Sequence, residues 1–517
     1  MVEYRININQ AVGNNTRFWE AAGLDHLYFL TFRPEGQSLL KRMKNKGSCR
    51  YLRNHHVLSS LILDGVQVGG EVYSEDESGN PVYRFEKINA VYKEFLKHGI
   101  KPVVEFDYLP DLLSLSGNKD RRAKAEGNPT SEAGPSDWKK WADLLKAFTQ
   151  NLGDTFGLEE IRTWYFEVWN EPDHWKIEDL PVFFRMYDVF VDAVTSVDDQ
   201  LRVGGPGCFH EYFLRDFLHH VVNGTNYVTG KKGTRIDFIS YHIYGISGGW
   251  VDQHPLVQPT VQRFVQEVLW IQRLVDSFPG LGKVEFHLNE WGVCSHYQKT
   301  SEEFPALEYR NSEFSPLFLT KLINCLYAIE DIYKFPTSML LYWGFAWEDY
   351  RGTLFNGNRS LTTAGHLPKP IQTGHEMLSM MGEERLKVHG PNPGGTFGVF
   401  ATRTGIRELQ FIVYNFNELE DAPQGEDWID IRLEGLAGAK CLEMKAYRLD
   451  REHHNTYREW QKQGSPQNPE GADMEKLAAC AELHCNQEFV LPVEEDGTLL
   501  TVSIPRHGMC LFIANLA

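Results

Sequence analysis

The segment 164–172 reads WYFEVWNEP, a short apolar run that ends in an asparagine, a glutamate and a proline. A nearly continuous apolar run is typical of a strand that is buried on both faces of a parallel sheet. Pro172 has no backbone N–H to donate, so the strand is expected to end before it. The segment 286–292 reads FHLNEWG and also ends in a glutamate beside an aromatic residue. Both segments therefore predict buried strands that end in a carboxylate, Glu171 in the first and Glu290 in the second.

Similar β-rich runs alternate with amphipathic helical stretches over the first 380 residues. The predicted strands cover residues 19–23, 51–57, 102–106, 164–169, 201–205, 236–241, 284–288 and 339–344. The predicted helices cover residues 36–46, 85–97, 136–151, 181–197, 259–277 and 314–332. Eight strands in this alternation predict an α/β fold of the (β/α)8 TIM barrel type. A doubly wound open sheet is the alternative, but no glycine-rich dinucleotide fingerprint follows any of the strands.

The pattern changes after residue 380 to short strands, and glycine and proline cluster at residues 389–395. Polar and apolar side chains alternate in residues 428–433, and a period of two predicts a half-buried sheet face. We therefore predict a barrel at residues 14–380 and an accessory β-sandwich at residues 381–517, which is completed by an N-terminal strand within residues 1–13. The polar stretch 455–485 is expected to be a long excursion from the sandwich.

The amino-acid composition narrows the classes of partner that the protein can bind. The chain has 517 residues, and its 52 basic and 70 acidic side chains give a net charge of −18. A nucleic-acid partner is not expected, because binding to phosphate depends on a basic surface. No membrane partner is expected either, because no apolar run reaches the roughly 18 residues of a transmembrane helix. The composition leaves self-association into a homo-oligomer open.

The eight cysteines form no Cys-x-x-Cys pair and show no metal-ligand spacing. Reduced thiols favour a cytoplasmic location. Cys480 and Cys485 could pair in an exported protein, and a secreted or periplasmic location stays open because a removed signal peptide leaves no trace. Histidine doublets occur at residues 55–56, 219–220 and 453–454, but adjacent side chains rarely point the same way. Neither a metal nor another cofactor is expected.

The two strand-end glutamates indicate the chemistry. Glu171 ends the fourth predicted strand and Glu290 the seventh, and barrel active sites form at the carboxyl ends of strands. Two carboxyl groups across a cleft are what glycoside hydrolysis requires, because one protonates the leaving oxygen while the other attacks the sugar or activates water. Tryptophans near strand ends would offer flat faces to sugar rings: Trp169, Trp175, Trp291, Trp343 and Trp347. The alternatives are arginine ion pairs for the glutamates and core packing for the tryptophans.

The segment 164–175 resembles the acid/base motif of glycoside hydrolase family 39, which contains β-xylosidases and α-L-iduronidases. The likeness extends through residues 202–206, 237–242 and 369–370, and through the YRLDREHHN stretch at 447–455. It implies a retaining, double-displacement mechanism in which Glu171 is the general acid/base and Glu290 is the nucleophile. In such a mechanism the nucleophile should stay ionised, whereas the pKa of the acid should be raised.

The resemblance also implies roles for the side chains that surround the two glutamates. Asn170 would bind the 2-hydroxyl of the sugar, and Arg53 would hold the nucleophile ionised. His55 would bind a sugar hydroxyl, while His242 and Tyr244 would position the nucleophile. For the two histidines, packing in the barrel interior is the alternative.

We expect the sugar to be neutral, as in a β-xylosidase-like exo-glycosidase. The iduronidase branch holds the uronate carboxylate with basic residues after the sixth strand, where this sequence has Ile243 and Tyr244. After the eighth strand, Glu348 would bind the hydroxyls of a neutral sugar. The predicted substrate-binding set thus includes Trp291, Trp343, Trp347 and Glu348 besides the residues named above.

Two other readings stay open at this point. Asp173 and His174 resemble the iduronidase branch, and Arg351 and Arg359 could bind a uronate, so an α-L-iduronidase-like hydrolase is the first alternative. The second is a carbohydrate-binding protein without catalytic activity.

Overall fold

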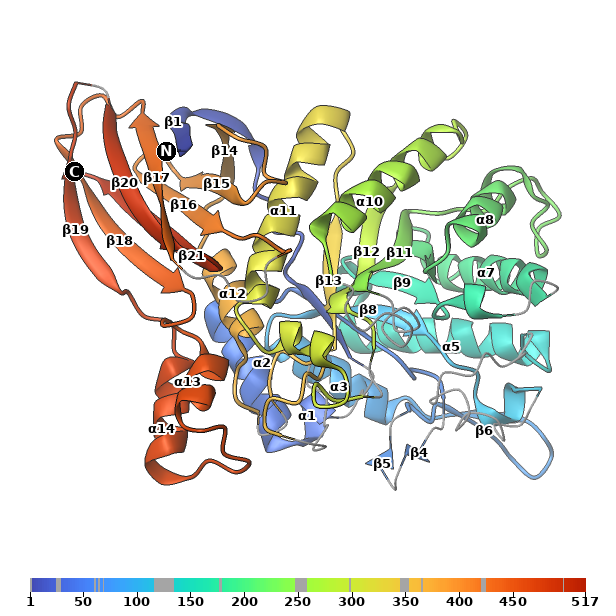
Figure 1. Ribbon diagram of the computed structural model, residues 1–517. Helices are drawn as coiled ribbons and strands as arrows, with labels where there is room; N and C mark the ends of the chain where they lie inside the picture. Colours follow the sequence, from blue (N-terminus) through green and yellow to red (C-terminus); the bar gives the residue numbers. More distant parts are fainter. Residues whose placement is uncertain are drawn as a thin grey trace.

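The computed structural model describes residues 2–24, 29–59, 62–63, 66–67, 69–115, 134–175, 179–246, 258–296, 299–344, 353–363, 366–419, 425–495 and 497–517. Parallel strands form a barrel from β2 (Ala21–Leu24), β3 (Tyr51–Asn54), β8 (Lys101–Phe106), β9 (Tyr165–Val168), β10 (Arg202–Cys208), β11 (Phe238–Ile246), β12 (Glu285–Cys294) and β13 (Met339–Trp343). The barrel closes in the order β10-β11-β12-β13-β2-β3-β8-β9 (Figure 1). The predicted eight-stranded barrel is confirmed.

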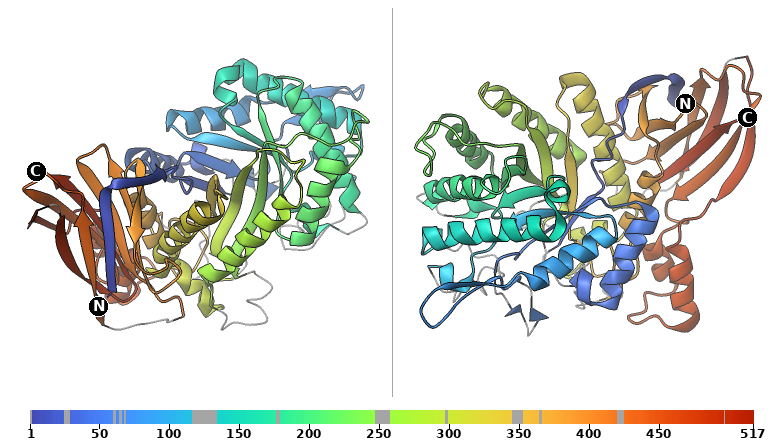
Figure 2. Two further views of the ribbon diagram at one scale, coloured as in Figure 1. Left: turned by 90° about the horizontal axis from the view of Figure 1, so that it is seen from above. Right: turned by 180° about the vertical axis from the view of Figure 1, so that it is seen from behind.

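Helices pack around the outside of the barrel (Figure 2). The longer ones are α2 (Pro34–Lys46), α3 (Glu86–Lys97), α5 (Trp138–Phe156), α7 (Leu180–Thr195), α8 (Glu211–Asn223), α10 (Val261–Asp276), α11 (Phe314–Tyr333) and α12 (Pro370–Ser379). The side chain of Asp137 caps α5 by accepting hydrogen bonds from the backbone N–H groups of Lys139 and Lys140. Trp141, Leu144, Leu145, Phe148 and Leu152 are buried on one face of this helix. This spacing follows the helical period and fixes the face that packs on the barrel.

Shorter elements connect the barrel strands. They are α1 (Phe29–Phe32), α6 (Leu158–Ile161), the 3-10 turns η1 (Asp111–Leu113), η2 (Pro172–His174) and η4 (Pro305–Arg310), and the hairpins β4 (Ile62–Leu63) with β5 (Val66–Gln67) and β6 (Tyr73–Glu75) with β7 (Pro81–Tyr83). Two of these border the strand-end glutamates, because η2 directly follows Glu171 and η4 follows the strand that carries Glu290.

The rest of the chain forms a nine-stranded sheet in the order β19-β18-β21-β16-β15-β14-β1-β17-β20. Its strands are β1 (Val2–Asn14), β14 (Glu384–His389), β15 (Phe397–Thr404), β16 (Glu408–Asn415), β17 (Glu426–Glu434), β18 (Cys441–Leu449), β19 (Gln487–Pro492), β20 (Gly497–Pro505) and β21 (Gly508–Leu516). The N-terminal strand β1 pairs antiparallel with β14 and parallel with β17.

This sheet curls until its edge strand β20 contacts β16, β21 and the opposite edge β19, which encloses a core of its own as a sandwich does. The alternating pattern in β17 buries Ile429, Ile431 and Leu433 inside, whereas Trp428 is 57% exposed. The accessory sheet domain is thus as expected. The division of the chain at residues 13 and 380 stays a prediction.

Two helices, α13 (Thr456–Lys462) and α14 (Gly471–Cys480), leave the sheet between β18 and β19 and lie beside the barrel (Figure 1). Both helices lie in the polar stretch 455–485, which the sequence predicts to be a long excursion from the sandwich.

All eight cysteines are free thiols, and the cytoplasmic location stays a prediction. In the described part of the chain, no helix combines the length and apolar character that crossing a membrane requires.

Candidate active site

The two strand-end glutamates lie together at the carboxyl ends of the barrel strands. Glu171 follows β9, and Glu290 lies within β12 opposite His242 of β11. The side chains of Glu171, His242 and Glu290 each have one oxygen or ring nitrogen in a common cluster. These three atoms all lie within 4.8 Å of one another. The barrel thus brings together two carboxyl groups and an imidazole that are separated by up to 119 residues in the sequence (290 − 171).

Arg53 of β3 is the centre of the polar network beneath the two glutamates. Its guanidinium donates to Glu290 at 2.9 Å, to Glu167 at 2.9 Å, to Glu105 at 2.7 Å and to Asn170 at 3.1 Å. The side chain is fully buried, and its carboxylate partners raise its pKa although burial alone would lower it. A charged, rigid fork of donors therefore holds one oxygen of Glu290 in place.

His55 lies beside Arg53 and faces the same site. Its Nδ1 is 2.9 Å from Glu105 Oε2, and its Nε2 is 3.7 Å from Glu290 Oε1. Burial and the neighbouring charge of Arg53 lower its pKa, so the imidazole is neutral. A neutral imidazole has one acceptor nitrogen, so with Nδ1 donating to Glu105, Nε2 carries the acceptor lone pair.

His242 and Tyr244 of β11 reach the two carboxyl groups from the neighbouring strand. His242 Nδ1 is 2.7 Å from Glu171 Oε1 and 3.6 Å from Glu290 Oε2. The hydroxyl of Tyr244 donates to Glu290 Oε2 at 2.9 Å. Together with Arg53, Tyr244 gives each oxygen of Glu290 a donor.

The protonation order in this cluster differs from the expected one. Burial would raise the pKa of Glu171, but the hydrogen bond and the charge of His242 outweigh it and lower the pKa to about 2. Burial raises the pKa of Glu290, and its donors offset this only in part. Burial would lower the pKa of His242, but both carboxylates outweigh it and raise the pKa. The proton expected on Glu171 is therefore held by His242, 2.7 Å from the Glu171 oxygen that it must reach.

The comparison with known proteins follows this geometry. The family model described as "Glycosyl hydrolases family 39" matches residues 2–498. The chain belongs to this family. It is thus a glycoside hydrolase, and the resemblance seen in the sequence is confirmed.

Several relatives of this family 39 hydrolase match over nearly the whole chain. A β-xylosidase of Caldicellulosiruptor saccharolyticus is 24% identical over 494 residues, which are 93% of this chain and 92% of that one. The crystal structure of a monomeric β-xylosidase from Caulobacter crescentus CB15 covers all of both chains with a TM-score of 0.79 and 21% identity. A bacterial orthologue of human α-L-iduronidase superposes with a TM-score of 0.80 at 18% identity, over 100% of this chain and 84% of that one. The last two show a shared fold.

The family 39 hydrolase holds Glu171 on a strained turn. Glu171 has a φ of 46° and Trp169 a φ of 67°, in the left-handed region that non-glycine residues rarely adopt. The backbone N–H of Glu171 donates to the carbonyl of Gly207 at 2.9 Å, so β10 fixes the position of the turn.

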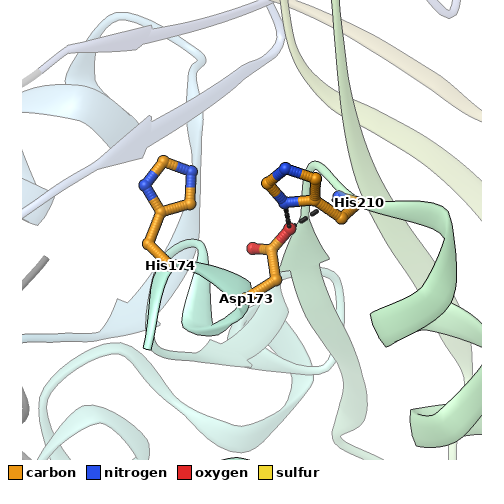
Figure 3. A group of neighbouring side chains, drawn as sticks. All are labelled: Asp173, His174 and His210. Atoms are coloured by element: carbon orange, nitrogen blue, oxygen red, sulfur yellow. Dashed lines mark hydrogen bonds and ion pairs between the residues drawn. The ribbon is translucent and has the colours of Figure 1, made fainter. Parts of the chain in front are cut away.

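Asp173 anchors the same turn from below (Figure 3). Its buried Oδ2 accepts hydrogen bonds from the backbone N–H of Phe209 at 2.9 Å and from His210, through the backbone N–H at 2.6 Å and Nδ1 at 2.7 Å. His174 lies on the other side, with Nε2 at 3.5 Å from Glu171 Oε2. Asp173 thus ties the turn that carries Glu171 to the segment before α8.

We expect Asp173→Ala to reduce turnover without unfolding the protein. The change leaves three N–H donors without their acceptor and frees the turn, and a displacement of about 1 Å near the chemistry can cost about 100-fold in rate. Steady-state kinetics on a substrate with a poor leaving group should show a loss of about 10- to 100-fold in kcat. Asp216→Ala, at an exposed position of α8, is the matched control, and equal effects of the two changes would contradict the anchoring role.

The tryptophans divide between the site and the core. Trp343 is buried in the barrel interior, with its ring 4.3 Å from His55 and 5.3 Å from the guanidinium of Arg53. Trp291, in contrast, is fully buried outside the barrel against Phe264 of α10 and Phe318 of α11. The expectation that Trp291 binds substrate is wrong, because successive strand residues face opposite ways and Glu290 takes the inward position.

Of the other residues predicted for the site, some are described in the structure and others lie outside the described residues. Trp169 packs edge-on against Tyr108 and Trp175, which braces the strained turn. Trp347 and Glu348, predicted to bind substrate, lie outside the described residues, as does Arg351.

Arg359 comes to the site through the segment that follows β13. Gly344 has a φ of +107°, and a Cβ there would lie 2.3 Å from Cβ of Arg359. Only glycine permits this close approach. The charge of Arg359 lowers the pKa of His55 and opposes the burial that raises the pKa of Tyr244, so Arg359 contributes positive charge to this part of the barrel.

The sequence prediction missed the polar residues beneath the catalytic pair. Glu105 and Glu167 are fully buried partners of Arg53, and Asn289 donates to both oxygens of Glu167 at 3.0 and 2.9 Å. A charged side chain inside an apolar strand is rarely buried unless it is paired, so each of these glutamates was a signal for a buried cation.

Three groups of described side chains have the spacing to bind a metal ion. They are Glu171 with His242 and Glu290, His55 with Glu105 and Asp107, and Asp173 with His174 and His210. Arg53 already binds Glu105 and Glu290, and His210 binds Asp173. The absence of a metal cofactor stays a prediction.

Proposed function

We propose that this family 39 hydrolase is a retaining exo-glycosidase that acts on a neutral, β-xyloside-like glycoside. The observation that carries the proposal is the approach of Glu171 and Glu290 oxygens to within 4.8 Å. Retaining glycosidases have carboxyl groups about 5–5.5 Å apart, whereas inverting ones need about 6.5–9.5 Å to place a water molecule. The short distance between the nearest oxygens favours the retaining arrangement.

In the first step, Glu290 attacks the anomeric carbon and the glycosidic oxygen leaves with a proton from Glu171. Arg53 and Tyr244 each donate to one oxygen of Glu290, which keeps the attacking carboxylate oriented. A sugar between the two carboxyl groups excludes water and disfavours separated charges. The proton of His242 then moves over 2.7 Å to Glu171, which becomes the neutral acid that the leaving oxygen needs.

In the second step, water attacks the glycosyl ester and Glu171 takes its proton. Esterification removes the charge of Glu290, which is one of the two carboxylates that raise the pKa of His242. His242 is neutral in the ester state, because its proton has passed through Glu171 to the leaving group. When water cleaves the ester, Glu290 regains its charge, the pKa of His242 rises again, and His242 takes back the proton that Glu171 has collected from water. One imidazole thus serves the carboxyl pair in both steps.

Two features support a neutral sugar. Two relatives that match by sequence over most of the chain are β-xylosidases, and that of Geobacillus stearothermophilus is 25% identical over 87% of this chain. Around the site, His55, Asn170 and Trp343 supply an imidazole, an amide and an aromatic ring, which suit the hydroxyl groups and the apolar face of a sugar.

The test is a panel of aryl glycosides with wild-type protein and Glu290→Ala. We expect aryl β-xyloside to be turned over faster than aryl α-L-arabinoside, β-galactoside or α-L-iduronide. The first-formed sugar, read by NMR before mutarotation, should keep the anomeric configuration of the substrate. An inverted first product would contradict the mechanism, and binding without hydrolysis of any glycoside would leave a carbohydrate-binding protein.

A uronate substrate is the second candidate, and Arg359 is the observation that favours it. Three carboxylates already accept from Arg53, and Arg359, in the segment after β13, adds a second positive charge that acts on Tyr244. If the sugar is a uronate, Arg359→Met should reduce kcat/KM for aryl α-L-iduronide by about 100-fold, as loss of a charge-assisted hydrogen bond pair does, and leave the xyloside within about threefold. Equal effects on both substrates would contradict this candidate.

A further inference from the structure

The YRLDREHHN stretch takes no part in the chemistry, yet it forms a closed turn that faces the barrel. The side chain of Asp450 accepts from the backbone N–H groups of Glu452 at 2.8 Å and His453 at 3.0 Å. The amide of Asn455 donates to the carbonyl of Asp450 at 3.0 Å and to Glu313 Oε2 at 2.9 Å. The turn is therefore rigid, and it ends in a contact with a barrel residue.

Glu313, just before α11, is where the turn and α13 meet the barrel. Arg458 of α13 donates to both oxygens of Glu313, at 2.9 and 2.8 Å, and Arg451 lies 3.3 Å away. Glu313 is 1% exposed, and its donors lower its pKa against the effect of burial. A bidentate contact between an arginine and a buried carboxylate requires a narrow range of orientations. This contact therefore fixes the orientation of α13.

From this anchor, α13 and α14 pack on the segment that follows β13. Tyr457, Trp460, Leu477 and Ala481 form one buried apolar cluster with Leu354, Phe355 and Leu367. The hydroxyl of Thr456 donates to the carbonyl of Pro368 at 2.7 Å. The hydroxyl of Tyr457 donates to Glu308 of η4 at 2.5 Å.

The same segment, residues 353–369 as far as it is described, is tied from its other side to the strand of Glu290. Arg310 of η4 is buried and donates to the carbonyls of Gly357 at 2.9 Å, Cys294 at 2.5 Å and His296 at 2.6 Å. Cys294 is the last residue of β12, and Gly357 is two residues before Arg359. The contacts therefore run without a break from the sheet domain to the rim of the active site.

We propose that the Asp450–Asn455 turn and helices α13 and α14 position the 353–369 segment at the barrel mouth, so that the sheet domain sets how tightly the glycone is held. The catalytic carboxyl groups lie elsewhere, on β12 and on the turn after β9, and are fixed by Arg53, Tyr244 and His242. Loosening the brace thus raises KM and leaves the chemical step intact. This inference rests on the proposed function for its kinetic readout only.

The test compares Arg458→Met and Tyr457→Phe with Lys462→Met. The first removes the grip on Glu313, and the second removes one hydroxyl from the contact with Glu308 while keeping the ring. Lys462 lies on the same helix, but its partner Glu452 is exposed, so it is the matched control. We expect Arg458→Met to raise KM about tenfold and to leave kcat within about twofold of wild type. Tyr457→Phe should raise KM about threefold. The control should match wild type.

Hydrogen exchange with mass spectrometry supplies a readout that needs no substrate. Amides of residues 353–363 should exchange at least about tenfold faster in Arg458→Met, while peptides from β9 and β12 keep their wild-type rates. A lower melting temperature with unchanged KM and unchanged exchange in 353–363 would overturn the brace and leave a merely structural role. If wild type hydrolyses no glycoside, the proposed function fails, and the exchange result still decides the inference. Should Arg458→Met fail to fold, the same criteria apply to Tyr457→Phe.

Discussion

Glu290→Ala is expected to lower kcat on every aryl glycoside by about 10⁴-fold or more, because the proposed mechanism forms its covalent bond to the sugar through the Glu290 carboxylate. Arg53 and Tyr244 orient the two oxygens of Glu290 in the wild type, and alanine has no oxygen that could take over the attack on the sugar. The fold should persist, because Arg53 keeps its bonds to Glu105 and Glu167. Steady-state kinetics and circular dichroism together check this expectation.

Two controls make the result specific. Glu285→Gln changes a half-exposed carboxylate on the same strand and should leave kcat within about threefold of wild type. Azide added to Glu290→Ala should restore turnover and yield a glycosyl azide of inverted configuration, because the anion attacks from the nucleophile's side. Substantial activity of Glu290→Ala without azide would contradict the assignment.

The barrel and the meeting of Glu171 and Glu290 at one face of it could be predicted from sequence, because both depend on local patterns. Apolar runs such as residues 164–169 mark buried strands, and the carboxylates that end two of them lie at the face where barrel sites form. The curl of the nine-stranded sheet could not be read in this way, because it depends on contacts between strands far apart in the chain. The docking of α13 on Glu313 depends on such contacts as well.

Within the site, the sequence prediction named the residues at strand ends but missed the buried polar residues that surround Arg53 beneath them. Trp291 was misplaced because a tryptophan beside a catalytic glutamate suggests a sugar platform, although strand alternation turns it outward. The proton on His242 was missed for a different reason. The pKa values of Glu171 and Glu290 depend on a 2.7 Å contact between β11 and the turn after β9, and no spacing in the sequence specifies such a distance.

Glu171→Ala is expected to separate substrates by leaving group. Loss of a general acid costs about 10²- to 10⁴-fold, but only where the departing oxygen needs a proton. For a disaccharide or an alkyl glycoside, kcat/KM should fall by about 10³-fold, whereas a dinitrophenyl glycoside should keep kcat/KM within about tenfold. With the activated substrate, kcat should still fall, because water attacks the ester without a base.

Three readouts distinguish this role from a structural one. Azide should raise kcat of Glu171→Ala on the activated substrate and yield a glycosyl azide of retained configuration, opposite to the product from Glu290→Ala. The alkaline decline of kcat/KM should disappear for that substrate, because the proton shared by His242 and Glu171 is then no longer used. In wild type this decline should lie above the ordinary histidine pKa of about 6.5, since both carboxylates raise the pKa of His242 and the proton is lost only as pH rises through that raised value. An equal loss on activated and unactivated substrates would assign the proton donor to another residue.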